Sequence, residues 1–190
     1  MPSGAKGPES FPGAISTPTS GPAHADHRAQ RVSAPAPATG GAALRDGVDF
    51  HLHSTCSDGV LPPAAVIAFA AECGVRLCSL TDHDTVAGLA EAATRARECS
   101  IDFVPGIELS ARWQGRTVHV VGLGIDPAAP AITDAIATRG VERRVRAERI
   151  RDRLDRAGAP GTAAYALVAA HALPTRTHFA RALVELGAVA

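Results

Sequence analysis

Short apolar runs alternate with helix-like segments over much of the chain. Alternate apolar positions predict a strand over 48–53, and a further apolar run predicts another over 75–80. Between them we expect a helix from Pro62 to the residue before Gly74, because proline suits the first helical turn and glycine the position after the last. A second helix is predicted over 86–99. This alternation is typical of an α/β fold with a largely parallel sheet.

Two more extended segments follow, over 101–113 and 116–125. Gln114 and Gly115 between them predict a tight connection. The second segment has apolar positions that we expect to be buried: Val118, Val120 and Leu123.

Helices are predicted for the rest of the chain, over 132–157, over about 163–172 and from near Thr177. In the first of them Gly140 favours a break or kink. Its apolar face would contain Ile132, Ile136, Ile150 and Leu154, and would be interrupted by Arg139 and Arg143.

The segment 139–156 has eight arginines and four acidic residues. The favoured interpretation is a solvated helix face with ion pairs four residues apart, such as Glu142 with Arg146 and Asp152 with Arg156. The alternative is a phosphate-binding surface.

Composition divides the chain near residue 46. Residues 1–46 hold seven of the fourteen prolines and few large apolar residues, so they predict a disordered extension. Residues 47–190 are predicted to form one domain, with a helical segment over 131–190.

The overall charge gives no argument for a polyanionic partner, so any such preference must be local. With 19 basic and 19 acidic residues the formal charge is zero, which argues against duplex DNA or a membrane surface bound by bulk charge. No apolar stretch is long enough to span a membrane. The spacing of the four cysteines does not indicate a disulfide framework. We therefore expect a soluble cytoplasmic protein of undetermined oligomeric state.

The first predicted strand leads into the sequence DFHLHSTCSDG, residues 49–59. Asp49, His51 and His53 would lie on one face of that strand, where ionisable groups need a partner that offsets their desolvation. A divalent metal is one such partner. For this motif alone, a hydrogen-bonded pair of core histidines is the stronger interpretation.

The next three extended segments each end in, or contain, further candidate ligands. The second leads into Asp82, His83 and Asp84, the third contains Glu108 and the fourth contains His119. In barrels of alternating strands and helices the strand ends surround one active site. The mixed imidazole and carboxylate set suits Mn²⁺, Fe²⁺ or Zn²⁺.

These motifs, with LTDHDTVAG, PGIELS, VHVVGLGID and TRTHFAR, resemble the PHP (polymerase and histidinol phosphatase) superfamily over residues 47–190. Within it they are most similar to the bacterial 3′,5′-nucleoside bisphosphate phosphatases and 5′-3′ exoribonucleases. The resemblance implies an α/β fold, a PHP-type distorted (β/α)7 barrel that is incomplete in this chain and carries a helical insertion.

The resemblance also implies the roles of individual residues. Asp82 and Asp84 would orient ligands or substrate, and Arg176 and His178 would contact phosphate, with Arg181 the weaker candidate. The implied metal ligands are His51, His53, Asp58, His83, Glu108 and His119. They would hold two or three divalent ions in the complete protein, with Mn²⁺ favoured over Fe²⁺ or Zn²⁺.

The implied activity is metal-dependent removal of the 3′-phosphate from nucleoside 3′,5′-bisphosphates, extending to short RNA degraded from its 5′ end. The alternatives are a histidinol-phosphatase-like enzyme and a truncated, inactive metal-binding fragment. Members of the superfamily have a later AHPG-type segment and an Asp-x-His motif, which do not occur between His178 and Ala190. The expectation is therefore a fragment or a truncated product.

Overall fold

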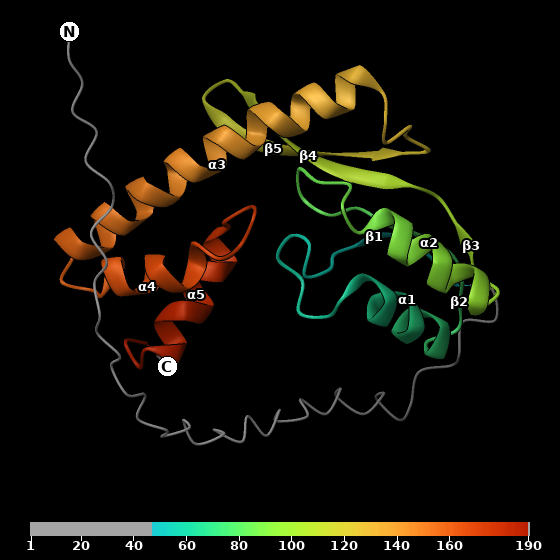
Figure 1. Ribbon diagram of the computed structural model, residues 1–190, viewed down its shortest axis with the longest axis horizontal. Helices are drawn as coiled ribbons and strands as arrows, with labels where there is room; N and C mark the ends of the chain where they lie inside the picture. The colour runs from blue at the N-terminus through green and yellow to red at the C-terminus, as the bar shows by residue number, and fades with distance from the viewer. Residues whose placement is uncertain (1–46, 190) are drawn as a thin grey trace, which may run out of the picture. The chain divides into compact units, whose positions relative to one another are not determined.

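The computed structural model describes residues 47–189, so the extension predicted over residues 1–46 lies outside the described residues. The described part has an α/β composition, with helices and strands in the order shown in Figure 1. Its elements are β1 (Gly47–Leu52), α1 (Pro63–Glu72), β2 (Val75–Leu80), α2 (Leu89–Glu98), β3 (Asp102–Phe103), β4 (Gly106–Trp113), β5 (Arg116–Leu123), α3 (Pro130–Arg156), α4 (Gly161–Val168) and α5 (Arg176–Glu185).

The strands β1, β2 and β3 form a parallel sheet with β2 in the middle, as the alternation of strands and helices predicted. Helices α1 and α2 pack on each other and on this sheet. Ile67, Leu80 and Ala92 are fully buried in the core between these elements. Burial of this apolar surface is the main force that holds the first half of the domain together.

The predicted extended segment 101–113 is divided in two. Its short first part, β3, pairs with β2, and its second part, β4, pairs with β5. The division falls at Val104 and Pro105, where proline lacks the N–H that a ladder requires.

The strands β4 and β5 form an antiparallel hairpin. The tight connection is confirmed: Gln114 and Gly115 both have positive φ, 47° and 78°, the conformation of a two-residue hairpin turn. The predicted burial of the apolar positions in β5 is wrong, because this strand pairs only with β4 among the described residues and leaves much of its surface open. The exposed fractions are 37% for Val118, 54% for Val120 and 43% for Leu123.

The long helix α3 continues through Gly140, so the predicted break is absent. Gly140 is buried, and an added Cβ would lie an ordinary 3.8 Å from Leu173, so the position does not require glycine. Further along, Ala147 packs with α4 and α5 in a second small core that includes Val168 and Phe179.

The last two helices differ slightly from the prediction. The predicted helix over 163–172 is α4, which begins and ends earlier, and α5 begins at Arg176 behind the cap residue Thr175. No described helix is long and apolar enough to cross a membrane.

Candidate metal centre

Two histidines come from the end of β1. His51 lies within the strand and is exposed, and His53 follows it and is half-buried. Their ring centroids are 5.0 Å apart. Because residues two apart project from the same side of a strand, both imidazoles reach the same region beyond the sheet.

The loop after β1 turns back on itself and presents Asp58. The carbonyl of Ser54 accepts hydrogen bonds from the N–H groups of Ser57, at 3.0 Å, and Gly59, at 2.9 Å. A Cβ at Gly59 would collide with the carbonyl of His53, so this turn requires glycine. The turn places Asp58 Oδ1 4.0 Å from His53 Nδ1.

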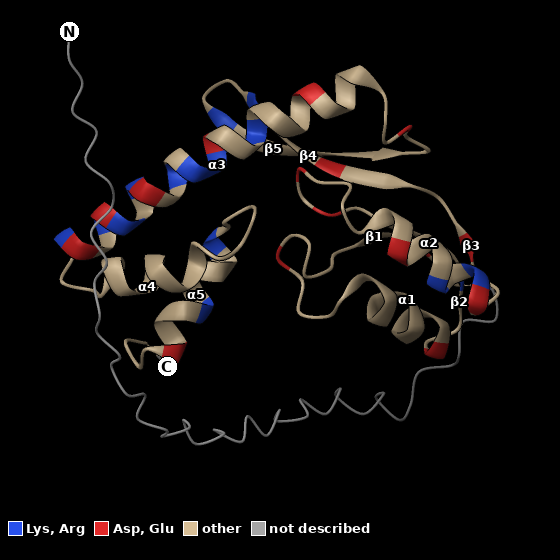
Figure 2. Cartoon of the chain, viewed as in Figure 1, with Lys and Arg blue, Asp and Glu red and all other residues tan. Residues whose placement is uncertain are grey.

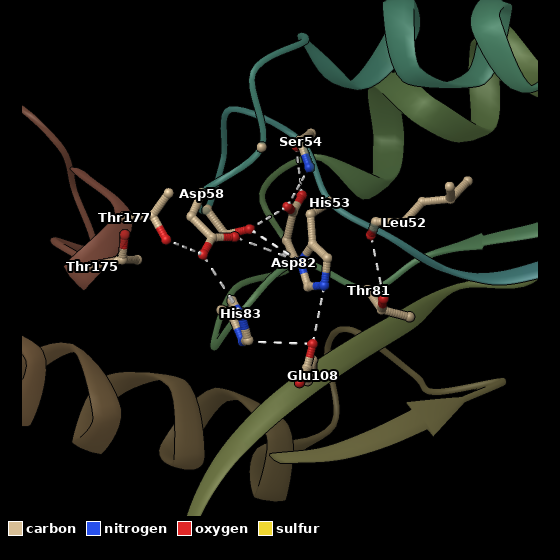
Figure 3. A network of polar contacts seen from close by, with 12 residues as sticks. Leu52, His53, Ser54, Asp58, Thr81, Asp82, His83, Glu108, Thr175 and Thr177 are labelled. Atoms are coloured by element: carbon tan, nitrogen blue, oxygen red, sulfur yellow. Dashed lines mark hydrogen bonds and ion pairs between the residues drawn. The ribbon is translucent and has the colours of Figure 1, made fainter. Parts of the chain in front are cut away.

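Asp82, at the end of β2, holds that loop in place (Figure 3). Its carboxylate accepts hydrogen bonds from Ser54 N at 2.7 Å, Ser54 Oγ at 2.6 Å and Ser57 Oγ at 2.6 Å. All three residues are buried. Asp82 therefore fixes the backbone on which Asp58 is carried.

The segment after β2 brings a third histidine to the start of β4. His83 and Glu108 form an isolated parallel bridge, in which Asp84 N donates to the carbonyl of Glu108 at 2.9 Å. Asp84 has φ 53°, a left-handed conformation that aspartate tolerates better than most residues. Gly106 permits this close approach of β4, because a Cβ there would collide with Ser79 Oγ.

Glu108 is the centre of the cluster, with a side chain that is 6% exposed. Its Oε2 lies 2.7 Å from His51 Nε2, 3.0 Å from His53 Nε2 and 3.6 Å from His83 Nδ1. Its Oε1 lies 3.4 Å from Nδ1 of His119, which comes from β5. Figure 3 shows His53 and His83 pointing toward this carboxylate.

The structure thus brings all six predicted ligands together. They form three overlapping groups, in each of which the ligand atoms lie within 4.8 Å of one another. The groups are His51 with His53 and Glu108, His53 with Asp58 and His83, and His83 with Glu108 and His119. Because neighbouring groups share residues, the arrangement suits adjacent ions better than a single one.

The buried ring nitrogen and the lowered pKa of His83 also fit metal binding. Its Nδ1 is buried and has no hydrogen-bond partner within the described residues. Burial lowers the pKa of His83, although Glu108 and Asp58 act to raise it, so the imidazole is kept in the neutral form that a metal requires. Imidazole and carboxylate donors without thiolate suit Zn²⁺, Fe²⁺ or Mn²⁺.

The Asp84 carboxylate binds residues of β4 and α3. Its Oδ1 accepts from Ser110 N at 2.7 Å, and its Oδ2 accepts from Arg143 Nε at 2.6 Å. Burial alone would raise the pKa of Asp84, but the Ser110 amide and the Arg143 guanidinium lower it, so the carboxylate is held ionised. Asp84 therefore joins β4 to α3 beside the cluster.

The two predicted phosphate contacts lie in different environments. Arg176 is exposed and lines a cavity beside α3. His178 is buried, and its Nδ1 accepts from Thr175 N at 3.2 Å while Thr175 Oγ1 accepts from His178 N at 3.2 Å. Burial lowers the pKa of His178 to about 4, so its ring is a neutral part of the cap of α5.

Helix α5 contacts the Asp58 loop through two residues. Thr177 Oγ1 donates to Asp58 Oδ2 at 3.2 Å, and Arg181 Nη2 donates to the carbonyl of Asp58 at 2.9 Å. Arg181 therefore supports the backbone of the loop in this structure.

Sequence reasoning missed four residues that support the cluster: Ser54, Ser57, Arg143 and Thr177. For Arg143 a signal was present, because it interrupts the apolar face predicted for α3. The serines and the threonine lie inside or beside the recognised motifs, but only the folded chain reveals what they contact.

A family model described as "PHP domain" matches residues 49–169. The chain belongs to the PHP domain family. The matched residues include all six members of the candidate metal-ligand cluster.

Named relatives of this PHP domain include two bacterial enzymes. A "5'-3' exoribonuclease" of Haemophilus influenzae is 42% identical over 74% of this chain and 52% of its own length. A "3',5'-nucleoside bisphosphate phosphatase" of Chromobacterium violaceum is 44% identical over 75% of this chain and 50% of its own length. The chain thus spans about half the length of the curated relatives it matches.

Solved structures also resemble this PHP domain. An amidohydrolase from Chromobacterium violaceum with bound sulfate has a TM-score of 0.70 at 44% identity, covering 75% of this chain and 51% of that one. A protein of Bifidobacterium adolescentis, proposed to be a metal-dependent phosphoesterase, has a TM-score of 0.67 at 28% identity, covering 76% of this chain and 51% of that one. The fold is thus shared with a family of metal-dependent phosphoesterases.

Proposed function

We propose that this PHP domain belongs to a metal-dependent phosphatase that removes the 3′-phosphate of nucleoside 3′,5′-bisphosphates and acts on short RNA from its 5′ end. The observation that carries the proposal is the buried Glu108 carboxylate, which four imidazoles surround. The names of the relatives support the choice of substrate, since one is a bisphosphate phosphatase and another is an exoribonuclease.

In the proposed reaction His51, His53, Asp58, His83, Glu108 and His119 hold divalent ions, with Mn²⁺ favoured. Such ions would supply Lewis-acid activation of water and of the phosphoryl group. Burial of Glu108 and His83 restricts water around these ligands and strengthens their attraction for positive charge. Asp82 keeps Asp58 in position through the serine network, which is the kind of support that fixes a ligand's orientation.

For the second phosphate of the substrate we propose Arg176 and His178. Arg176 has the better placement, because it is exposed and carries a permanent charge. His178 would have to contact phosphate while its Nδ1 accepts from Thr175.

We also propose that β1 to β5 form part of a PHP-type distorted barrel, with the helical segment 131–190 as an insertion. The family match and the two structural neighbours support this arrangement.

The test is to load the purified chain with Mn²⁺, to offer it adenosine 3′,5′-bisphosphate and to measure released phosphate. The proposal expects turnover that is lost in His53→Ala and kept in an exposed control, Arg97→Gln. Faster turnover of histidinol phosphate than of the bisphosphate would favour a histidinol-phosphatase-like enzyme. If two or more ions bind but neither substrate is hydrolysed, the proposal fails for this chain.

A further inference from the structure

Five arginines lie along one face of α3. Residues 139, 143, 146, 149 and 153 are separated by four, three, three and four positions, which is the spacing of one helical face. At 1.5 Å per residue this row is about 21 Å long. It is therefore much longer than one phosphate group.

This face borders a cavity of about 480 Å³ between α3, the β4–β5 hairpin and the start of α5. Figure 2 shows basic positions recurring along α3 and on α5. Arg112 from β4 and Arg176 from α5 add two more cations to the lining, whose only acidic members are Asp84 and Glu142. The lining is thus strongly positive although the whole chain has no net charge.

The two acids are already paired. Asp84 binds Arg143, and Glu142 lies 2.7 Å from Arg139. The predicted pairs four residues apart are wrong, since Glu142 contacts Arg139 and Asp152 contacts Arg151 at 2.8 Å. Arg146, Arg149 and Arg153 therefore have no acidic partner among the described residues.

Arg146 shows that burial and neighbouring cations disfavour its positive charge at this site. It is half-buried, and burial together with Arg143 and Arg176 lowers the pKa of its guanidinium. Cations gathered in a concave, partly desolvated site attract a polyanion, which would offset both desolvation and mutual repulsion.

The cavity and the candidate metal-ligand cluster lie along the same face of the β4–β5 hairpin. Glu108, Ser110 and Arg112 alternate along β4, so their side chains share a face. In β5, His119 lies opposite Ser110 and Thr117 lies opposite Arg112. This face carries ligands at one end, and Ser110, Arg112 and Thr117 line the cavity further along.

We propose that this cavity binds the phosphodiester backbone of a single-stranded oligonucleotide that extends from the metal-ligand cluster along α3. The proposal rests on the proposed function and adds a binding site for nucleotides beyond the reacting one. A volume of about 480 Å³ is in the range of sites for small ligands, which gives room for a short stretch of single-stranded backbone.

The test measures binding separately from hydrolysis. A fluorescein-labelled, 5′-phosphorylated hexaribonucleotide is titrated with the chain in EDTA, and fluorescence anisotropy is recorded from 50 to 200 mM salt. The variant Arg149→Gln/Arg153→Gln removes two charges from exposed arginines of the cavity. The matched control, Arg76→Gln/Arg97→Gln, removes two exposed arginines that do not line it.

The cavity variant should bind the hexaribonucleotide at least about tenfold more weakly, and the salt slope of log K should become shallower by about 1.4, since each phosphate contact on a single strand contributes about 0.7. The control should keep the affinity and slope of the original chain. Circular dichroism checks that each variant is folded.

Equal affinities and slopes for the cavity variant and the control, or no hexaribonucleotide binding by the original chain, would overturn the inference. Phosphate release from adenosine 3′,5′-bisphosphate is measured in parallel. If that activity is absent while the binding difference holds, the proposed function fails and the binding site stands. If the activity is present and the binding difference is absent, the binding site fails alone.

Discussion

Asp84 and Arg143 form a buried ion pair that joins the segment after β2 to α3. Arg143 Nη2 lies 2.5 Å and Nε 2.6 Å from Asp84 Oδ2, and the side chains are 5% and 0% exposed. Arg143 also donates to Ser110 Oγ at 3.1 Å. The pair thus fixes α3 beside the strand that carries Glu108.

Removal of one partner should strongly destabilise the domain. Arg143→Met leaves the buried Asp84 carboxylate without its cation, and we expect the free energy of unfolding to fall by about 3 to 5 kcal/mol. Urea denaturation measures this change. The matched control is Arg139→Met, which breaks the more exposed pair with Glu142 and should cost no more than about 1 kcal/mol.

The double variant Asp84→Asn/Arg143→Met should be more stable than the sum of the two single losses implies, because it leaves no unpaired charge. Equal losses in the free energy of unfolding for Arg143→Met and Arg139→Met would contradict this account of the pair.

The Asp82 network should affect metal affinity without contributing a ligand. Asp82→Ala removes the acceptor for Ser54 and Ser57, and the loop that carries Asp58 loses its support. We expect Mn²⁺ binding, measured by calorimetry, to weaken by about 10- to 100-fold. Asp102→Ala, at an exposed position of β3, should bind Mn²⁺ as the original chain does. An unchanged affinity in Asp82→Ala would show that the loop does not need this carboxylate.

His178 should make the stability depend on pH. Its pKa is about 4 in the folded chain, against 6.5 ordinarily, because of burial, His171 and Arg181, while Asp58 and the Ser57 backbone act in the opposite direction. As pH falls from about 6.5 toward 4, the unfolded chain takes up a proton that the folded chain refuses, so stability from the neutral cap is lost.

His178→Gln tests this, because glutamine can fill the same capping position without titrating. Unfolding of both chains in urea and EDTA would be compared from pH 7 to pH 4.5. The free energy of unfolding of the original chain should fall relative to the variant by about 2 kcal/mol over that range. A constant difference between the two chains would refute a titrating cap.

The sequence was sufficient to predict the first sheet and the gathering of the six candidate ligands at one place. The reason is geometric, because His51, His53 and His83 lie at or just after the ends of two parallel strands. Such strand ends meet at one edge of a sheet. Glu108 and His119 are candidates because four successive extended segments each bring a histidine or a carboxylate at or near their ends.

Other features depend on contacts between distant residues. The exposure of Val120 follows from which strands pair with β5, and alternation within one strand carries no information about its neighbours. Arg143 interrupts an apolar helix face, yet its partner Asp84 lies 59 residues away. The same limit applies to the cavity beside α3, whose lining comes from β4, β5, α3, α5 and the segment after β2 that carries Asp84.

The central claim is that Glu108 and its surrounding histidines hold metal ions. The most direct measurement is the metal content per chain after dialysis against Mn²⁺, for the original chain, for Glu108→Gln and for the exposed control Glu98→Gln. The account predicts two or more ions in the original chain and the control, and fewer in Glu108→Gln, because the lost carboxylate belongs to two of the three ligand groups. A metal-free original chain, or equal metal content in Glu108→Gln and the control, would contradict it.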